Sequence, residues 1–222
     1  MQSLSDVIQA LAARGCQDVT SEIAPDGFSQ YPVYSGGFGE IYSGRMRNGT
    51  KVAVKRARYH LEDDREGHNM RLIAREIHAW GKCHHDNVLE LLGLTQHRGK
   101  LAVVAPWMEN GNLRQYLGKN PDVDRIDLCL QITRGLAYLH IHDMVHGDLK
   151  GANVLISNTG VPKLADFGNT KLKEQTLQLT TRTSTPFSLR WAAPEILNNS
   201  PCSMAADVYA LGMTIYVCEL SQ

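Results

Sequence analysis

The chain contains the stretch His146-Gly147-Asp148-Leu149-Lys150-Gly151-Ala152-Asn153, which an apolar run follows at once (Val154, Leu155, Ile156). A carboxylate, a cation and an amide therefore lie close together along the chain. In phosphoryl transfer, a carboxylate orients the attacking hydroxyl, a lysine neutralises the moving phosphoryl group, and an asparagine oxygen holds a metal ion. Taken alone, the stretch is also compatible with a polar loop before a buried strand.

Length and composition limit the classes of protein to consider. The 222 residues suffice for one large domain or two small lobes, and 43% apolar with 21% charged residues is typical of a globular protein. The zero formal net charge argues against nucleic acid or an acidic membrane as the main partner. We find no secretion signal and no apolar run long enough to span a membrane, and therefore expect a cytoplasmic protein without membrane insertion.

The five cysteines are far apart and odd in number, and none of them has the spacing of a metal site. We therefore expect reduced, structural thiols.

A glycine-rich turn lies between two strand-like runs within residues 31–44 and contains Gly36, Gly37 and Gly39. Glycines at such a turn let backbone N–H groups approach phosphates closely, although plain tight turns are at least as common. No helical pattern follows the turn. This argues against a dinucleotide-binding fold, in which the glycines open a helix.

The strand predicted at residues 51–55 places Lys51, Ala53 and Lys55 on one face. A lysine on an inward face usually has a carboxylate partner. Glu76 is a candidate, because it lies beside the apolar stripe of a helix predicted over residues 68–82. The alternative is a solvated Glu76 that pairs with an arginine of the same helix.

The other elements are predicted from periodicity and turn residues. Residues 3–14 form a short amphipathic helix, and residues 16–29 form a linker. Strands cover 88–94 and 101–105, with a turn at 96–100, and the connector from Pro106 is the candidate boundary between two lobes. Helices follow at 112–117, at 124–142 with an apolar stripe (Ile126, Leu130, Thr133, Ala137), and at 203–220.

Two further motifs complete an ordered set. Asp166-Phe167-Gly168 precedes a long loop rich in Ser and Thr, and Ala193-Pro194-Glu195 follows that loop. These two motifs join the glycine turn, the V-A-V-K strand and H-x-D-L-K-x-x-N. The presence of all five motifs in this order along the chain is highly specific. Over residues 30–220 the sequence resembles the eukaryotic protein kinases, and within them the tyrosine-kinase-like group. Lys150 favours Ser/Thr specificity, whereas the segment around Trp191 looks more like tyrosine kinases.

The resemblance implies an α+β, two-lobed fold with ATP in the cleft between the lobes. Its parts would be an N-terminal helix and linker (1–29), a β-rich N-lobe (30–105), a hinge (106–110) and a mostly helical C-lobe (111–222). It implies catalytic roles for Asp148 and Lys150 and magnesium binding by Asn153 and Asp166. It assigns ATP binding to Gly36, Gly37, Gly39, Ile41, Ala53, Lys55, Glu76, Ala105, Pro106, Met108 and Leu155.

The implied activity is transfer of the γ-phosphoryl group of MgATP to Ser or Thr hydroxyls of protein substrates. The alternative is a truncated kinase or pseudokinase that binds ATP or a partner without turnover. Two departures from the family pattern bear on this choice. Tyr34 replaces the first loop glycine, so we expect weaker closure over the phosphates. Gly147 replaces an arginine that usually meets a loop phosphate, so we expect activity that depends little on loop phosphorylation.

The third departure concerns the C-terminal end of the sequence. The family continues beyond the position of Gln222 with several more helices, so we expect an incomplete C-lobe. The helix at 203–220 would then leave an apolar face uncovered (Leu211, Ile215, Cys218).

Overall fold

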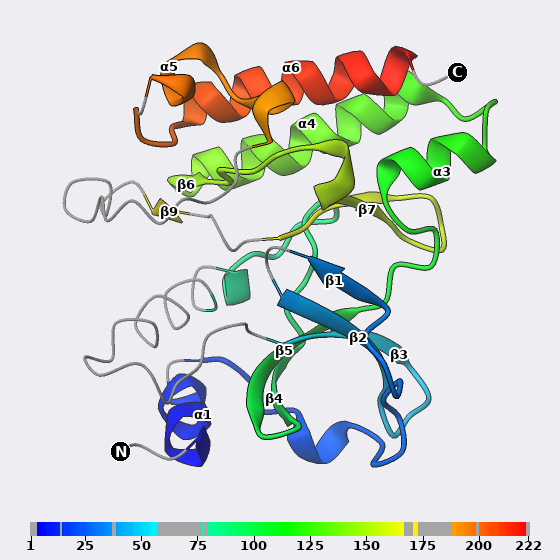
Figure 1. Cartoon of the computed structure of the whole chain (residues 1–222), viewed down its shortest axis with the longest axis vertical. Helices are drawn as coiled ribbons and strands as arrows, with labels where there is room; N and C mark the ends of the chain where they lie inside the picture. The colour runs from blue at the N-terminus through cyan, green and yellow to red at the C-terminus, as the bar shows by residue number, and fades with distance from the viewer. Residues whose placement is uncertain are drawn as a thin grey trace. The chain divides into compact units, whose positions relative to one another are not determined.

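The computed structural model describes residues 4–13, 15–36, 39–56, 77, 80–166, 171–172, 188–198 and 200–220. The chain divides into two compact units, and each is described by itself (Figure 1). The first unit comprises Met1–Cys83 and Glu90–Trp107, and the second comprises His84–Leu89 and Met108–Gln222. The first contains an antiparallel sheet and the second contains the long helices, which confirms the predicted α+β class.

The sheet of the first unit has five strands in the order β1-β2-β3-β5-β4. Their bounds are β1 Tyr34–Gly36, β2 Gly39–Arg45, β3 Lys51–Arg56, β4 Gly93–His97 and β5 Lys100–Pro106. The strand predicted at 88–94 is wrong for most of its length. Val88 and Leu89 instead pair with Leu164 of the second unit, and β4 begins only at Gly93.

The strand register divides the side chains of the sheet between two faces. Directly opposite residues of antiparallel strands point to the same side. We call one side the lysine face (Tyr34, Ile41, Ala53, Lys55, Val103, Ala105) and the other the valine face (Tyr42, Val52, Val54, Ala102, Val104). The prediction that Lys51, Ala53 and Lys55 share one face is confirmed.

The N-terminal segment covers the valine face. Residues 16–29, predicted to form a linker, instead contribute Val19 and Ile23, only 1% and 4% exposed, to the cluster that contains Val52 and Val54. Backbone bonds fix the segment: the Val19 N–H donates to the Leu94 carbonyl at 2.9 Å. In Figure 1 the segment, with its short helix η1 (Thr20–Glu22), runs beside the curved sheet.

The helix predicted at the N-terminus is confirmed as α1 (Leu4–Ala12). Ile8 and Leu11 are buried in a cluster with Leu94 and Ile77, against which Val103 also packs. Because Leu94 stands opposite Val103, α1 covers the β4–β5 part of the lysine face.

His97, the last residue of β4, makes stability depend on pH. Its ring centre lies 4.4 Å from that of Phe28 and 4.5 Å from that of Tyr42, and its buried Nε2 has no hydrogen-bond partner among the described residues. Burial, followed by the charges of Arg98 and Arg56, lowers the pKa of His97 below its usual value. The unfolded chain therefore takes up the proton first as pH falls, so stability is complete above about pH 6.5 and declines below it.

We expect the free energy of unfolding to fall as pH drops below about 6.5, by at most about 1.4 kcal/mol per pH unit from this group. Urea denaturation of the wild type and of His97→Phe across this range measures the effect. The variant keeps an aromatic ring but cannot titrate, so its profile should be flatter. Parallel profiles would contradict this assignment.

The second unit is built mainly from helices. They are α3 (Leu113–Lys119), α4 (Arg125–Ile141), α5 (Pro194–Leu197) and α6 (Met204–Leu220). Asn112 and Gln115 form a capping box on α3, and the Asp124 side chain accepts from the Asp127 N–H at the start of α4. The predicted helices at 112–117, 124–142 and 203–220 are confirmed. The short strands are β6 (Met144–Val145), β7 (Val154–Ile156), β8 (Pro162–Leu164) and β9 (Lys171–Leu172).

The inward face of α4 differs from the predicted stripe. Ile126 and Leu130 are 70% and 51% exposed, while the buried stripe contains Leu128, Ile132, Leu136 and Leu139. The helix is apolar on two sides, so periodicity alone could not select the core side. Gly135 lies on the buried side of α4, where the backbone packs closely against Asn87: a Cβ at Gly135 would lie 2.5 Å from the Asn87 carbonyl oxygen.

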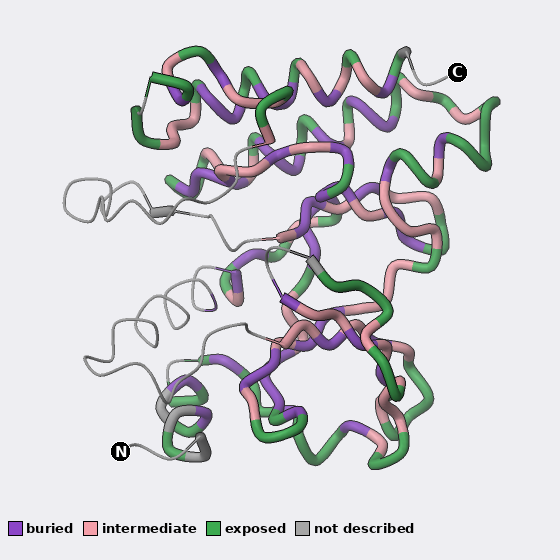
Figure 2. Tube along the Cα trace, in the orientation of Figure 1, coloured by how far each residue is buried: buried purple, intermediate pink, exposed green. Residues whose placement is uncertain are grey.

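The prediction that Leu211, Ile215 and Cys218 form an uncovered face of α6 is also wrong. Leu211 and Cys218 are 8% and 0% exposed, and Ile215 is half-buried. The exposed residues are Val208, Tyr209 and Tyr216, and Figure 2 shows exposed and buried positions alternating along this helix. Leu211 and Cys218 face into the unit, where Arg125 of α4 donates to the Cys218 carbonyl at 2.6 Å.

All five cysteines lie at described positions and are thiols rather than disulfides. Burial raises the pKa of Cys83 to about 11 and that of Cys218 to about 12, which keeps both thiols neutral. Among the described residues, no helix is long and apolar enough to cross a membrane.

Candidate active site

The loop after β6 is anchored by a buried carboxylate of α6. Asp207 is 2% exposed and accepts from the backbone N–H groups of His146 and Gly147 at 2.7 and 2.9 Å. His140 Nε2 of α4 lies 3.1 Å from the same carboxylate. Asp207 thus contacts two backbone donors of the loop just before Asp148 and one side chain of α4, which holds the loop in place.

His146 is 0% exposed and connects this loop to the residues before Asp166. Its Nδ1 lies 3.3 Å from the Asp148 N–H and therefore accepts, so Nε2 carries the proton and donates to the Ala165 carbonyl at 3.1 Å. This pattern assigns the neutral, Nε2-protonated tautomer. A buried histidine thus ties the backbone at Asp148 to the backbone beside Asp166.

The Asp148 carboxylate is the centre of the site. Lys150 Nζ lies 2.7 Å from Oδ2, and Asn153 Nδ2 donates to the same oxygen at 3.0 Å. Asn153 Nδ2 also donates to the Asp148 carbonyl at 2.8 Å, so Oδ1 is the amide atom that can bind a cation. The short helix η3 (Gly151–Asn153) turns the chain so that the acid, cation and amide predicted from the sequence meet.

Ser188 is a member of this group that the sequence did not single out. Its Oγ accepts from Lys150 Nζ at 2.9 Å and donates to Asp148 Oδ1 at 3.3 Å. In the sequence it is one of many Ser and Thr residues of a long loop, and no local signal distinguishes it. The other Ser and Thr residues of that cluster lie outside the described residues.

If Asp148 and Lys150 carry out catalysis, Ser188→Ala should lower kcat about tenfold, because both side chains lose a partner that holds them in place. The KM for ATP should stay within about twofold, and Ser188→Thr should restore most of kcat because it keeps the hydroxyl. Steady-state kinetics of both variants check this. If Ser188→Ala and Ser188→Thr lowered kcat equally, the hydroxyl would have no role.

Asp166, a predicted magnesium ligand, follows a residue whose backbone contacts Asn153. The Ala165 N–H donates to the Asn153 carbonyl at 2.9 Å, and Asp166 itself has φ +70°. A non-glycine residue in this region is uncommon and is often found at functional sites. A carboxylate and an amide oxygen suit Mg²⁺, which binds few protein ligands and completes its shell with water and phosphate. Among the described residues, no three His, Cys, Asp or Glu residues form a metal cluster.

The lysine face gathers several residues predicted to bind ATP. Ile41 stands opposite Lys55, and Ala53 stands opposite Ala105. Ile41, Ala53 and Lys55 are half-buried, and Ala105 is 4% exposed. These four residues of the predicted ATP-binding set therefore lie on the same face of the sheet.

The remaining predicted ATP-binding residues are spread over the chain. Gly36 pairs with Gly39 at the end of the hairpin, and a Cβ at Gly39 would lie 2.6 Å from the Arg56 carbonyl oxygen, so the sheet itself requires this glycine. Pro106 ends β5, whereas Met108 and the half-buried Leu155 of β7 belong to the second unit. Gly37, Glu76 and Phe167 lie outside the described residues.

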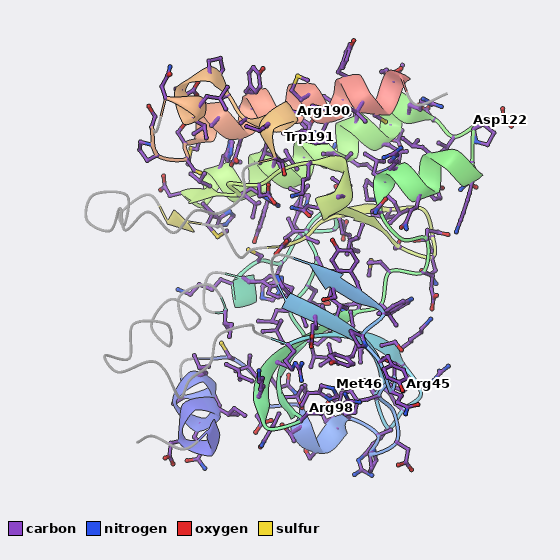
Figure 3. The ribbon with its side chains drawn as sticks, in the orientation of Figure 1. Arg45, Met46, Arg98, Asp122, Arg190 and Trp191 are labelled. Carbon is purple, nitrogen blue, oxygen red and sulfur yellow. The ribbon has the colours of Figure 1, made fainter. Side chains whose placement is uncertain are left out.

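A small pocket opens beside Asp148 within the second unit. It has a volume of about 40 Å³, and its lining includes Asp148, Ser188, Trp191 and Ile196. The Trp191 Nε1 atom is buried and has no hydrogen-bond partner among the described residues. Figure 3 shows Arg190 and Trp191 next to each other in η6 (Leu189–Trp191), where the Arg190 guanidinium lies 5.8 Å from the Trp191 ring centre.

The sheet, the helical unit and the Asp148 site are the features expected of the protein kinase family. The family model described as "Protein tyrosine and serine/threonine kinase" matches residues 30–221, and the chain belongs to this family. The predicted resemblance, including the tyrosine-kinase-like group, is confirmed.

Curated relatives agree with this membership. The chain is 33% identical to a probable serine/threonine-protein kinase of Dictyostelium discoideum over 81% of its length. It is 31% identical to the serine/threonine-protein kinase STY46 of Arabidopsis thaliana over 84%, and 36% identical over 82% to a leaf rust 10 disease-resistance locus receptor-like protein kinase of the same plant. The matches span only 36%, 32% and 29% of those proteins, about a third of their length.

Proposed function

We propose that the chain is an ATP-dependent protein kinase that transfers the γ-phosphoryl group of MgATP to Ser or Thr hydroxyls of protein substrates. The observation that carries this proposal is the Asp148 carboxylate, which Lys150, Asn153 and Ser188 contact at 2.7, 3.0 and 3.3 Å. This set matches the acid, cation and amide that phosphoryl transfer requires.

In this proposal, Asp148 accepts or orients the proton of the substrate hydroxyl. Lys150 is held beside it by Asp148 and Ser188, and its charge stabilises the phosphoryl group during transfer. The two backbone N–H groups just before Asp148 donate to Asp207, which the His140 side chain also contacts, so the carboxylate of Asp148 is oriented before substrate arrives. Such preorganisation lowers the cost of reaching the reactive geometry.

MgATP supplies the phosphoryl group, and its metal ion neutralises charge on the phosphates. Asn153 Oδ1 and the Asp166 carboxylate would hold Mg²⁺, since both are hard oxygen ligands. On the lysine face, Lys55 would contact the phosphates, while Ile41, Ala53 and Ala105 offer apolar contacts to adenine. The family resemblance also implies that further residues bind ATP, and we include them in this proposal: Gly36, Gly37, Glu76, Pro106, Met108 and Leu155.

The pocket beside Asp148 supports a polypeptide as the substrate. Its volume of about 40 Å³ is sufficient for a small side chain or about three waters. The Trp191 indole N–H is a buried donor at the same place, and a peptide carbonyl would satisfy it. Lys150, which the family resemblance associates with Ser/Thr kinases, favours Ser or Thr as the acceptor. The reduced thiols support a cytoplasmic location for this activity.

The test is incubation of the chain with Mg²⁺, radiolabelled ATP and a general protein substrate, followed by phosphoamino acid analysis. We expect phosphoserine or phosphothreonine, and MgATP binding in the absence of substrate. Phosphotyrosine alone would overturn the Ser/Thr specificity. MgATP binding without any transfer would support the alternative, a binding module without turnover. No binding would overturn both.

A further inference from the structure

We propose that Tyr34 is a further nucleotide-binding residue, whose ring covers the base and ribose of ATP on the lysine face. This inference rests on the proposed function, because it concerns the same nucleotide. From the sequence we expect weaker closure over the phosphates at this position, whereas a contact between the ring and the base would strengthen ATP binding.

The strand register places Tyr34 in one row with predicted nucleotide residues. Tyr34 stands opposite Ile41, Ile41 stands opposite Lys55, and Lys55 stands opposite Val103. Cβ atoms of such directly opposite pairs are about 5 Å apart, so each side chain is within reach of its neighbour. Tyr34 is therefore at the end of a row that continues through Ile41 to Lys55.

The row is covered at one end and open at the other. At the Val103 end, Ile8 and Leu11 of α1 bury Leu94 and its neighbours. Toward the other end, Lys55 and Ile41 are half-buried, and Tyr34 on the edge strand is 63% exposed. A flat ligand that contacts Ile41 and Ala53 would reach the ring of Tyr34 before it reached solvent.

The position of Tyr34 along the strand selects the part of the nucleotide that it meets. Gly36 and Gly39, whose backbone would approach the phosphates, are at the turn of the hairpin, while Tyr34 lies at the start of β1. The ring is thus beside the apolar wall that Ile41 offers to the base. Stacking of an aromatic side chain on a base contributes about 1–3 kcal/mol when measured by alanine substitution.

The other effect that Tyr34 could have on ATP binding has the opposite sign. A bulky residue at the place of a glycine could hold the hairpin backbone away from the phosphates, as the sequence alone suggests. Removing the side chain would then strengthen binding, and only for ligands with phosphates. The two effects can therefore be separated by comparing ligands.

The experiment measures the affinities of MgATP, MgADP and adenosine by calorimetry for the wild type, Tyr34→Ala, Tyr34→Gly and Tyr34→Phe. We expect Tyr34→Ala and Tyr34→Gly to lower the affinity for all three ligands about tenfold. Tyr34→Phe should bind them within about twofold of the wild type. Tyr31→Ala is the matched control. Tyr31 is 72% exposed three residues away but outside the sheet register, so its removal should have no effect.

Unchanged or tighter MgATP binding in Tyr34→Gly would overturn the inference, and a gain confined to MgATP and MgADP would assign Tyr34 the obstructing role. Thermal melts of each variant show whether the fold is kept, which an exposed position should allow. If the wild type bound none of the ligands, the proposed function itself would fail. If the wild type bound them and the variants matched it, only the role of Tyr34 would fail.

Discussion

Asp148→Asn should lower the rate of phosphoryl transfer by about 10³-fold, within the range that general acid–base groups contribute. Asparagine has nearly the same shape and can still accept from Lys150 Nζ, which lies 2.7 Å from Oδ2 in the wild type. It cannot take a proton from a substrate hydroxyl, and it lacks the charge that orients that hydroxyl. MgATP binding should change by less than about twofold, because the proposed metal ligands remain.

Single-turnover kinetics with saturating ATP, together with MgATP titration, check this expectation. Asp122→Asn is the matched control, since Asp122 is exposed in the turn between α3 and α4 (Figure 3). It makes the same chemical change in the same unit and should leave the rate unchanged. A rate for Asp148→Asn within tenfold of the wild type would show that this carboxylate is not the group that acts on the hydroxyl.

Asp207→Ala should destabilise the second unit by about 3–5 kcal/mol, the usual range for removing one partner of a buried polar network. The carboxylate is 2% exposed and accepts from two backbone N–H groups and lies beside His140 Nε2. Without it, all three donors lose their partner in a place that water reaches poorly. The loss is a large share of a typical total stability of about 5–15 kcal/mol.

Denaturant unfolding followed by circular dichroism measures this loss. Asp127→Ala is the control, because Asp127 is an exposed carboxylate of α4 that accepts from Gln131 at 2.6 Å. It should cost less than about 1 kcal/mol. If Asp207→Ala cost no more than Asp127→Ala, the anchor would contribute little to the fold. Loss of transfer in Asp207→Ala would then have to come from the loop geometry alone.

The grouping of the candidate catalytic residues could be predicted because they are close together in the sequence and their chemistry is local. Asp148, Lys150 and Asn153 lie within one turn of chain, and η3 brings them together. Ser188 and His140 could not be predicted this way. Ser188 is 40 residues from Asp148, and His140 meets Asp207 across 67 residues, so only the fold creates these contacts.

Hydrophobic patterning located the helices but not their buried sides. Asp124 and Asn112 are local signals, and both helices begin at the residues after these caps. The apolar stripe of Ile126 and Leu130 has helical spacing but lies on the exposed side of α4. The buried side carries a second apolar stripe around Ile132. Which stripe is buried depends on partners distant in sequence, such as Asn87 beside Gly135.

The N-terminal segment shows the same limit in a different way. Its polar composition with Pro25 and Gly27 is typical of a connection, and its few fully buried apolar residues are Cys16, Val19 and Ile23. Its attachment comes largely from backbone bonds, such as the Ala24 N–H to the Arg45 carbonyl at 2.9 Å. Backbone pairing of this kind leaves no pattern in side-chain composition.

The same segment affects how this kinase should be shortened for laboratory work. The region of family similarity begins at residue 30, which lies after Val19 and Ile23 in the chain. A recombinant protein that started there would present Val52, Val54 and Tyr42 to solvent as one apolar surface. Such a surface promotes aggregation during expression, so the natural start of the folded unit is upstream of the boundary that similarity marks.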